Sequence, residues 1–244
     1  MRRRIVFILL LGLFIGLTIW ITGIGRIGVY SAFTSADLLR ESGNHFQMVG
    51  IAALVAIAVG VPLGILLTRP RFIKLSPFVI GGVGMGQCIP SMALIAIMAP
   101  LMGFGFWPAI VALFIYGLLP ILRNSYVGIR NIDPAIIEAA SGMGMSRGQI
   151  ARKVELPLAR PVIMAGIRTS TVINVGTAAL AVLVGGTGLG KIILTGVFSR
   201  QALITLQGAA PTAAMAIVLD FILESIENWM TPRGLKVQKQ RGEG

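Results

Sequence analysis

Two carboxylates stand in the last apolar stretch of this 244-residue chain, where a buried charge is expensive. Asp220 lies near the middle of that stretch, and Glu224 lies one helical turn further along the same face. A carboxylate at the centre of a bilayer costs roughly 2.5–3.5 kcal/mol on insertion scales, so it must face a helix bundle or a water-filled path. Asp220 could attract a cation on such a path or form an interhelical ion pair with Arg168. Glu224 is expected to be an ion-pair partner or to lie near the inner surface.

Three uncharged polar residues, Gln87, Asn174 and Thr177, also lie within apolar stretches. They could line a translocation path, or they could join helices by hydrogen bonds worth about 1 kcal/mol or less. Together with Asp220 they are the candidate path residues. The lone His45 is expected to be an interfacial polar residue rather than a ligand, and no residue set indicates catalysis, a metal site or a bound cofactor.

A glycine-rich segment resembles a nucleotide site only in part. Gly185-x-x-x-x-Gly190-Lys191 matches the phosphate-binding loop of ATPases up to its final position, where Ile192 replaces the Ser or Thr that binds magnesium. The segment also follows no soluble strand–helix pattern. We therefore expect a tight turn at the outer face, and any ATP hydrolysis must be supplied by another chain.

Long apolar blocks position these side chains. The chain is 55% hydrophobic and 12% charged, whereas soluble proteins are about 25% charged. Blocks of roughly 20 residues match an α-helix that crosses a ~30 Å hydrocarbon core. Pro90 is expected to kink the third block. The sequence thus predicts an all-α, multi-pass membrane protein with about six transmembrane helices, at residues 5–24, 46–67, 77–100, 105–122, 161–184 and 207–228.

The distribution of basic residues predicts the orientation. If the N-terminus is inside, 16 of the 21 Lys and Arg residues fall in inner segments and four in outer segments. Because inner loops carry the excess of Lys and Arg, both termini and residues 123–160 are predicted to be cytoplasmic. The net charge of +12 is spread over these loops, where it can meet anionic lipid headgroups. A basic groove with interleaved aromatic residues is absent, so we expect no nucleic-acid binding.

The inner segment 123–160 begins with strong helix signals. Asp133-Pro134 is typical of an N-cap followed by proline at the first helical position. The helix is expected to continue to Met143, and Gly142 and Gly144 permit a sharp turn after it.

A second short helix should follow that turn. Ser146 and Gln149 form the pattern of a capping box, which predicts a helix over roughly residues 147–155. It should end before Pro157, since the residue preceding a proline is disfavoured in the helical region. The segment is therefore predicted to be a helix–turn–helix elbow, which either lies on the lipid surface or docks a cytoplasmic partner.

Seven residues of this elbow follow a longer pattern: Glu-Ala-Ala, three residues, Gly, nine residues, then aliphatic-x-Leu-Pro. They are Glu138, Ala139, Ala140, Gly144, Val154, Leu156 and Pro157. The pattern resembles the EAA signature of permease subunits of binding-protein-dependent, type I ABC importers, in which isoleucine is more usual at the position of Val154. The resemblance implies that these residues couple the permease to a separate ATP-binding subunit, which carries the ATP and magnesium.

Three further stretches extend the resemblance over roughly residues 46–234. They are Gln87–Ser91, Tyr116–Asn124 and Gly185–Gly190, which are similar to permeases for glycine betaine, choline and carnitine. Cys88 departs from the pattern, since threonine is frequent there. The implied organisation is a first helix and outer segment (1–45), a permease core with its coupling loop (46–230) and a basic cytoplasmic tail (231–244).

The resemblance also implies partners and a location. These are an ATP-binding subunit, an extracytoplasmic solute-binding protein, a second identical or similar permease chain, and the lipid of the cytoplasmic membrane. Three alternatives stay open: an importer of methionine or another amino acid, an ATP-independent channel or carrier, and a membrane scaffold. A pair of broken helices in inverted repeats, which would favour a secondary carrier, is not evident.

Overall fold

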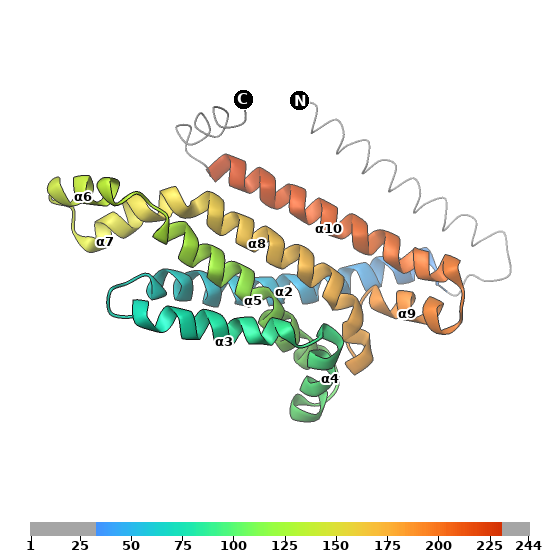
Figure 1. Cartoon of the computed structure of the whole chain (residues 1–244). Coiled ribbons are helices and arrows are strands. Elements are labelled where there is room, and N and C mark those ends of the chain that lie inside the picture. Colours follow the sequence, from blue (N-terminus) through green and yellow to red (C-terminus); the bar gives the residue numbers. More distant parts are fainter. Residues whose placement is uncertain (1–32, 231–244) are drawn as a thin grey trace.

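The computed structural model describes residues 33–230, which form helices and connecting turns without any strand (Figure 1). The all-α prediction is confirmed for this part of the chain. The predicted first span, 5–24, and the tail, 231–244, lie outside the described residues. In chain order the helices are α2 (Ser35–Leu67), η1 (Ile73–Leu75), α3 (Ser76–Cys88), α4 (Ser91–Met102), α5 (Phe106–Arg130), α6 (Pro134–Gly142), α7 (Arg147–Ile150), η2 (Ala151–Glu155), α8 (Leu156–Ala178), η3 (Ala179–Val184), α9 (Gly190–Phe198) and α10 (Ala202–Met230).

Four stretches of the described residues are long and apolar enough to cross a membrane: α2, α5, the continuous region 147–184 that contains α8, and α10. The predicted span 77–100 is not one straight helix. The segments Ile73–Cys88 and Ser91–Met102 meet at a bend of 97°, and only together can they count as a fifth span. The break lies at Ile89, whose backbone is extended (φ −75°, ψ 128°), because the following Pro90 disfavours a helical residue before it.

Helix α2 begins eleven residues before the predicted span 46–67. Thr34 caps its first turn, and the Asp37 side chain accepts from the Thr34 backbone N–H, so that both halves of a capping box are present. The boundary predicted between residues 45 and 46 therefore falls inside one continuous helix. A hydropathy pattern misses this start because the first three turns carry polar residues.

The centre of the bundle is the packing of α2, α5 and α8 (Figure 1). Met48, Leu113 and Val175, one from each helix, are fully buried in the same apolar cluster. Gly64 allows α2 to approach α5 closely, since a Cβ there would lie 2.7 Å from the carbonyl oxygen of Leu122. Small residues of this kind are typical of close contacts between membrane helices.

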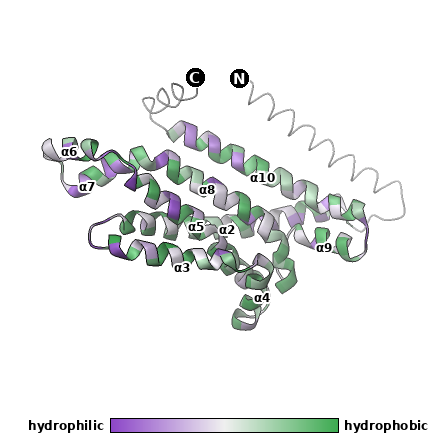
Figure 2. Ribbon diagram, viewed as in Figure 1, coloured by the Kyte–Doolittle hydropathy of each residue, from purple (hydrophilic) through white to green (hydrophobic). Residues whose placement is uncertain are grey.

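The outer surface of the bundle is also apolar. Figure 2 shows hydrophobic residues on several sides of the long helices, and Phe78, Leu101 and Trp107 are each more than half exposed. A helix that is apolar all round is typical of a membrane environment. The short helices α6 and α7 extend beyond the bundle at one end, whereas α4 and α9 lie toward the other (Figure 1).

Candidate functional site

The elbow after α5 begins with the predicted cap. A carboxylate oxygen of Asp133 accepts a hydrogen bond of 2.9 Å from the backbone N–H of Ala135, and Pro134 occupies the first helical position of α6. Proline is tolerated there because its missing N–H would have no partner within the helix. The local sequence alone thus fixes where α6 starts.

Helix α6 ends in a Schellman motif centred on Gly144. The Met145 N–H bonds to the carbonyl of Ala140 at 3.2 Å, and the Gly144 N–H bonds to that of Ser141 at 2.9 Å. Gly144 has a φ of +79°, the left-handed conformation that glycine adopts without strain. Gly142, which we also expected to shape the turn, is instead the last helical residue.

The second helix of the elbow does not end at Leu156, so that part of the prediction is wrong. The capping box of Ser146 and Gln149 is present, but the chain continues from α7 through the π-helical turn η2 into α8. The Leu156 N–H bonds to the carbonyl of Ala151, five residues back. We attribute the tolerance of Pro157 to this wider turn, which re-pairs backbone groups next to a residue without an N–H.

The structure divides the seven signature residues into two groups. One group lies on the exposed surface of the elbow, where a partner can reach it: Glu138, Ala139 and Gly144. The other group is at least partly buried, in the elbow or where it joins α8: Ala140, Val154, Leu156 and Pro157. The signature therefore covers both an exposed surface of the elbow and partly buried residues where the elbow joins α8.

An ion pair that the sequence did not indicate fixes the base of the elbow. Arg69, just after α2, faces Glu155 in η2 with two parallel hydrogen bonds, of which the Nη1–Oε1 bond is 3.1 Å long. The Glu155 side chain is 12% exposed. Such a two-point pair is strongly directional. It joins the end of α2 to the start of the α8 region.

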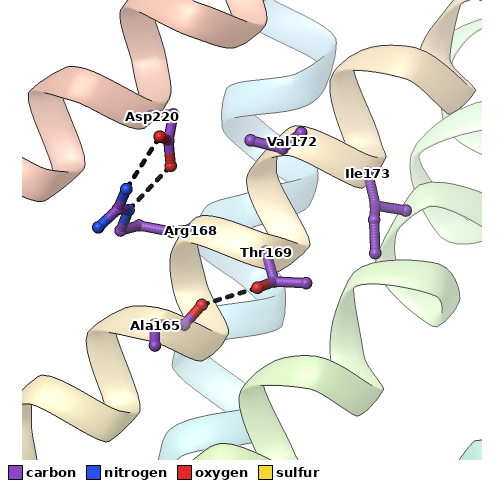
Figure 3. Close-up of a pocket in the computed structure, with 6 residues that line it drawn as sticks. All are labelled: Ala165, Arg168, Thr169, Val172, Ile173 and Asp220. Carbon is purple, nitrogen blue, oxygen red and sulfur yellow. Dashed lines mark hydrogen bonds and ion pairs between the residues drawn. The ribbon is translucent and has the colours of Figure 1, made fainter.

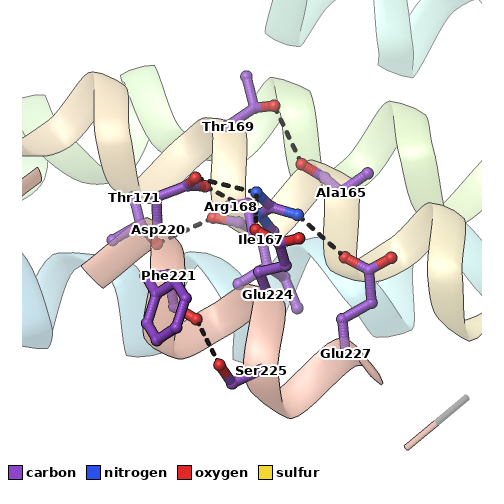
Figure 4. Close-up of polar contacts among 10 residues, drawn as sticks. All are labelled: Ala165, Ile167, Arg168, Thr169, Thr171, Asp220, Phe221, Glu224, Ser225 and Glu227. Carbon is purple, nitrogen blue, oxygen red and sulfur yellow. Dashed lines mark hydrogen bonds and ion pairs between the residues drawn. The ribbon is translucent and has the colours of Figure 1, made fainter. Parts of the chain in front are cut away.

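A second charged group lies between α8 and α10 (Figure 4). Arg168 forms a two-point pair with Asp220, at 2.8 Å from Nε and 2.9 Å from Nη2, and also approaches Glu227 at 3.3 Å and Glu224 at 3.5 Å. The ion-pair interpretation of Asp220 and Glu224 is confirmed. Glu227 was not predicted, although its spacing places it on the same face of α10.

A pocket of about 460 Å³ opens beside this pair (Figure 3). Arg168 and Asp220 line it together with Thr169, Val172 and two other residues of α8. The Thr169 hydroxyl donates its proton to the carbonyl of Ala165. The main polar groups that face the pocket are therefore those of the ion pair. Both charge signs border the pocket, where they are paired with each other. A role for Asp220 in a path stays a prediction.

Gln87 bonds to a backbone carbonyl within the neighbouring helix α5. Its Nε2 donates to the carbonyl of Tyr116 at 2.7 Å. That carbonyl lies four residues before Pro120, which has no N–H to offer it. The Tyr116 hydroxyl in turn donates to the carbonyl of Ile89, where α3 and α4 are bent apart. Gln87 thus joins the bend in the broken span to the proline of α5.

Asn174 of α8 is fully buried beside Gly117 of α5. A Cβ on Gly117 would lie 2.7 Å from its Nδ2 and 2.6 Å from the Oγ of Ser170, so glycine makes room for both polar groups. Neither amide atom of Asn174 has a hydrogen-bond partner among the described residues. Thr177, one turn further, is partly exposed. Asn174 thus lies in the interior of this chain's own helix bundle. Its role in a translocation path stays a prediction.

Two buried polar residues of α2 lie against the glycine-rich turn, and one of them bonds to it. Glu41 accepts a hydrogen bond of 2.9 Å from the Gly188 N–H, and the Nε2 of His45 lies 3.0 Å from the carbonyl oxygen of Val175. His45 is therefore buried and not interfacial as expected. Gly185 and Gly188 have positive φ values of 81° and 124°, which confirms the tight turn.

Comparisons with known proteins agree with this arrangement. Residues 60–234 match the family described as binding-protein-dependent transport system inner membrane component. The glycine betaine/carnitine/choline transport system permease protein OpuCB of Bacillus subtilis is 45% identical over 204 residues, which are 84% of this chain and 93% of OpuCB. The osmoprotectant import permease protein OsmY of Salmonella typhimurium is 37% identical over 232 residues, 95% of this chain and 97% of OsmY.

A solved structure is also similar in fold. A chain of the MetNI methionine ABC transporter, in an inward-facing conformation, aligns with a TM-score of 0.74 at 25% sequence identity. The alignment covers 82% of this chain and 100% of that chain. The type I importer arrangement expected from the elbow is therefore confirmed as the fold.

Proposed function

Because this chain belongs to the binding-protein-dependent transport system inner membrane component family, we propose that it carries a quaternary-amine osmoprotectant such as glycine betaine into the cell. It is a multi-pass protein of the cytoplasmic membrane and the permease component of an ABC importer. The cargo rests on one observation, the 45% identity with a permease named for glycine betaine, carnitine and choline.

The geometry supports mechanical coupling to an ATPase. In our proposal the exposed side of α6, with Glu138 and Ala139, docks in a separate ATP-binding subunit that binds ATP and magnesium. Helix α6 is connected to α7 by the Gly144 turn, and α7, η2 and α8 are continuous, so a displacement passed from α6 to α7 would carry α8 with it. The Arg168–Asp220 pair then connects α8 to α10. This chain supplies movement and a path rather than covalent chemistry.

The full transport cycle requires further partners. A solute-binding protein would deliver the cargo at the outer end, and a second identical or similar permease chain would complete the path. Rocking of the two permease chains, driven by closure of the ATP-binding subunits, would expose that path alternately to each side. The path residues in this proposal are Gln87, Asn174, Thr177 and Asp220, of which Asp220 alone lines the described pocket beside Arg168.

A methionine importer is the second candidate. The likeness to the MetNI chain supports it, although at 25% identity it argues for the fold more than for the cargo. A zwitterionic amino acid and zwitterionic glycine betaine both suit a pocket that presents Arg168 and Asp220 together. Competition between the two solutes separates these candidates.

Uptake of labelled glycine betaine tests the proposal. Cells lacking this chain and all other betaine routes receive the wild type or Gly144→Trp, with unlabelled choline, carnitine and methionine as competitors. We expect uptake with the wild type only, competition by choline or carnitine, and none by methionine. If methionine alone competes, the proposed cargo is wrong. If uptake persists when the ATP-binding subunit is inactivated, the ATP-driven mechanism is wrong.

A further inference from the structure

A groove between α3 and α5 lies away from the elbow surface and from the Arg168 pocket. Its volume is about 460 Å³, and its lining includes Ser76, Gly81, Gly84, Arg123 and Tyr126. The polar members lie at the start of α3 and in the second half of α5. That is the end of the bundle from which the elbow projects, which the basic residues identify as cytoplasmic.

Arg123 is the only charged residue that lines this groove, and it is exposed. Within residues 33–230 no carboxylate forms an ion pair with it. The segment before α3 has three further cations. Arg69 is paired with Glu155, Arg71 stacks over the ring of Phe72, and Lys74 is exposed but does not line the groove. The groove therefore has an uncompensated positive charge at its mouth.

Two hydroxyl groups stand beside that charge. The Oγ of Ser76 lies 2.7 Å from the carbonyl oxygen of Ile73 and 3.2 Å from the Oη of Tyr126. Ser76 is the donor in both contacts, so the Tyr126 Oη accepts and its own proton remains available to another group. A guanidinium and a phenol at one mouth are a suitable donor set for a phosphate.

The rest of the groove is apolar and open. A Cβ on Gly81 would meet nothing within 4 Å, and one on Gly84 would only touch a methyl group of Leu119 at 3.8 Å. Large apolar side chains flank the groove on α3, where Phe78 is 79% and Met85 is 68% exposed. An occupant must therefore be anionic at one end and hydrocarbon along the rest.

We propose that this groove binds one anionic phospholipid of the inner leaflet, with its phosphate at Arg123 and Tyr126 and an acyl chain along Gly81 and Gly84. Basic pockets between membrane helices on the cytoplasmic side are suited to such headgroups. A second permease chain would need a carboxylate to match Arg123, whereas a lipid provides both the charge and the hydrocarbon. Occupancy of the groove would hold α3 against α5 next to the bend between α3 and α4.

Native mass spectrometry of the full chain, purified in mild detergent with the subunits that accompany it, tests this proposal. The probes are phosphatidylglycerol and phosphatidylcholine with identical acyl chains. We expect the wild type to retain phosphatidylglycerol about fivefold better, the factor that corresponds to roughly 1 kcal/mol per basic residue near an anionic lipid. Arg123→Gln should abolish this preference, and Arg130→Gln, an exposed position that does not line the groove, should keep it.

A second pair of variants distinguishes lipid binding in the groove from nonspecific attraction of lipids to the positively charged protein. Gly81→Leu should fill it and reduce retention of both lipids at least fivefold, whereas Gly82→Leu, in equally open space outside the lining, should not. Co-purification with the other subunits verifies folding of each variant. Equal lipid retention by the wild type and Arg123→Gln, or displacement of the lipid by millimolar inorganic phosphate, would overturn the proposal. Efficient crosslinking of Gly81→Cys to a second permease chain would also overturn it.

Discussion

Arg69 and Glu155 are 86 positions apart in the sequence, yet they meet through two hydrogen bonds at the base of the elbow. Arg69 follows the last turn of α2, and Glu155 is the final residue of η2. The pair therefore connects the helix at the centre of the bundle with the segment that leads from the exposed elbow into α8. If the elbow docks an ATP-binding subunit as proposed, its movement would act on α2 and α8 together.

Breaking this pair should weaken both stability and transport. Glu155→Gln and Arg69→Gln each remove one charge of a partly buried pair, so we expect a coupling energy of about 1–3 kcal/mol in a double-mutant cycle on the free energy of unfolding. Uptake should fall in both single variants. Arg152→Gln, an exposed neighbour, is the matched control and should behave as the wild type. Additive effects of the two substitutions would mean that the pair does not couple.

Gly144 should tolerate only residues that adopt the left-handed conformation. Gly144→Ala should lose about 1–2 kcal/mol of local stability at the Schellman motif and reduce co-purification of the ATP-binding subunit. Gly144→Asn should retain most of this stability and of the co-purification, because asparagine adopts the left-handed conformation more readily than alanine. Gly142→Ala is helical and unobstructed, so it serves as the control and should bind fully. Equal binding by all three variants would contradict a role of the turn in docking.

Local signals explain why the elbow was largely predictable. Asp133, Ser146 and Gly144 act on backbone groups a few residues away, so their types and spacing already determine caps and turn. The expected stop before Pro157 failed because its backbone preference is outweighed by the π-helical turn and by the packing of the joint. The backbone preference of one residue does not reveal how the residues around it pack in the folded protein.

Distant contacts were predictable only where charge forced them. Asp220 needed a partner inside the membrane, and Arg168 was one of few cations within reach, so the pair stood among the alternatives. The start of α2 was missed since Glu41 and His45 look interfacial by composition. They are buried because a turn about 140 residues later, at Gly188, folds over them.

Substitution of Arg168, which lies between α8 and α10, should reduce stability and uptake more than substitution of any one of its carboxylate partners. Arg168→Gln removes the cation that three carboxylates on one face of α10 share, so we expect the largest loss of unfolding free energy and of uptake. Asp220→Asn removes the two-point bond and should rank second, with transport affected more than folding. Glu224→Gln removes only a 3.5 Å contact and should rank last.

Thermal unfolding and uptake kinetics of these three variants, in the same membrane preparation, check that order. Combining Arg168→Gln with Asp220→Asn should recover part of the stability, since one repelling carboxylate is gone. Normal uptake kinetics for Asp220→Asn would assign that residue to structure alone, and a loss for Glu224→Gln greater than for Asp220→Asn would contradict the geometry.

Gln87 should matter for stability only while Pro120 is present. Gln87→Met keeps the side-chain length but removes the donor to the Tyr116 carbonyl, which should cost about 1 kcal/mol within a membrane bundle. Pro120→Ala restores the backbone N–H that pairs with this same carbonyl in a regular helix. On that background Gln87→Met should therefore cost clearly less, and the two substitutions should be non-additive.

Unfolding in mixed micelles of the four proteins in this cycle measures the effect, with uptake assayed in parallel. Tyr116→Phe keeps the carbonyl but loses the hydroxyl bond to Ile89, so its effect should add to that of Gln87→Met. If Gln87→Met costs the same with either residue at position 120 and uptake falls in both, Gln87 does not act through the proline-freed carbonyl. Its predicted contact with the transported solute would then be the better explanation.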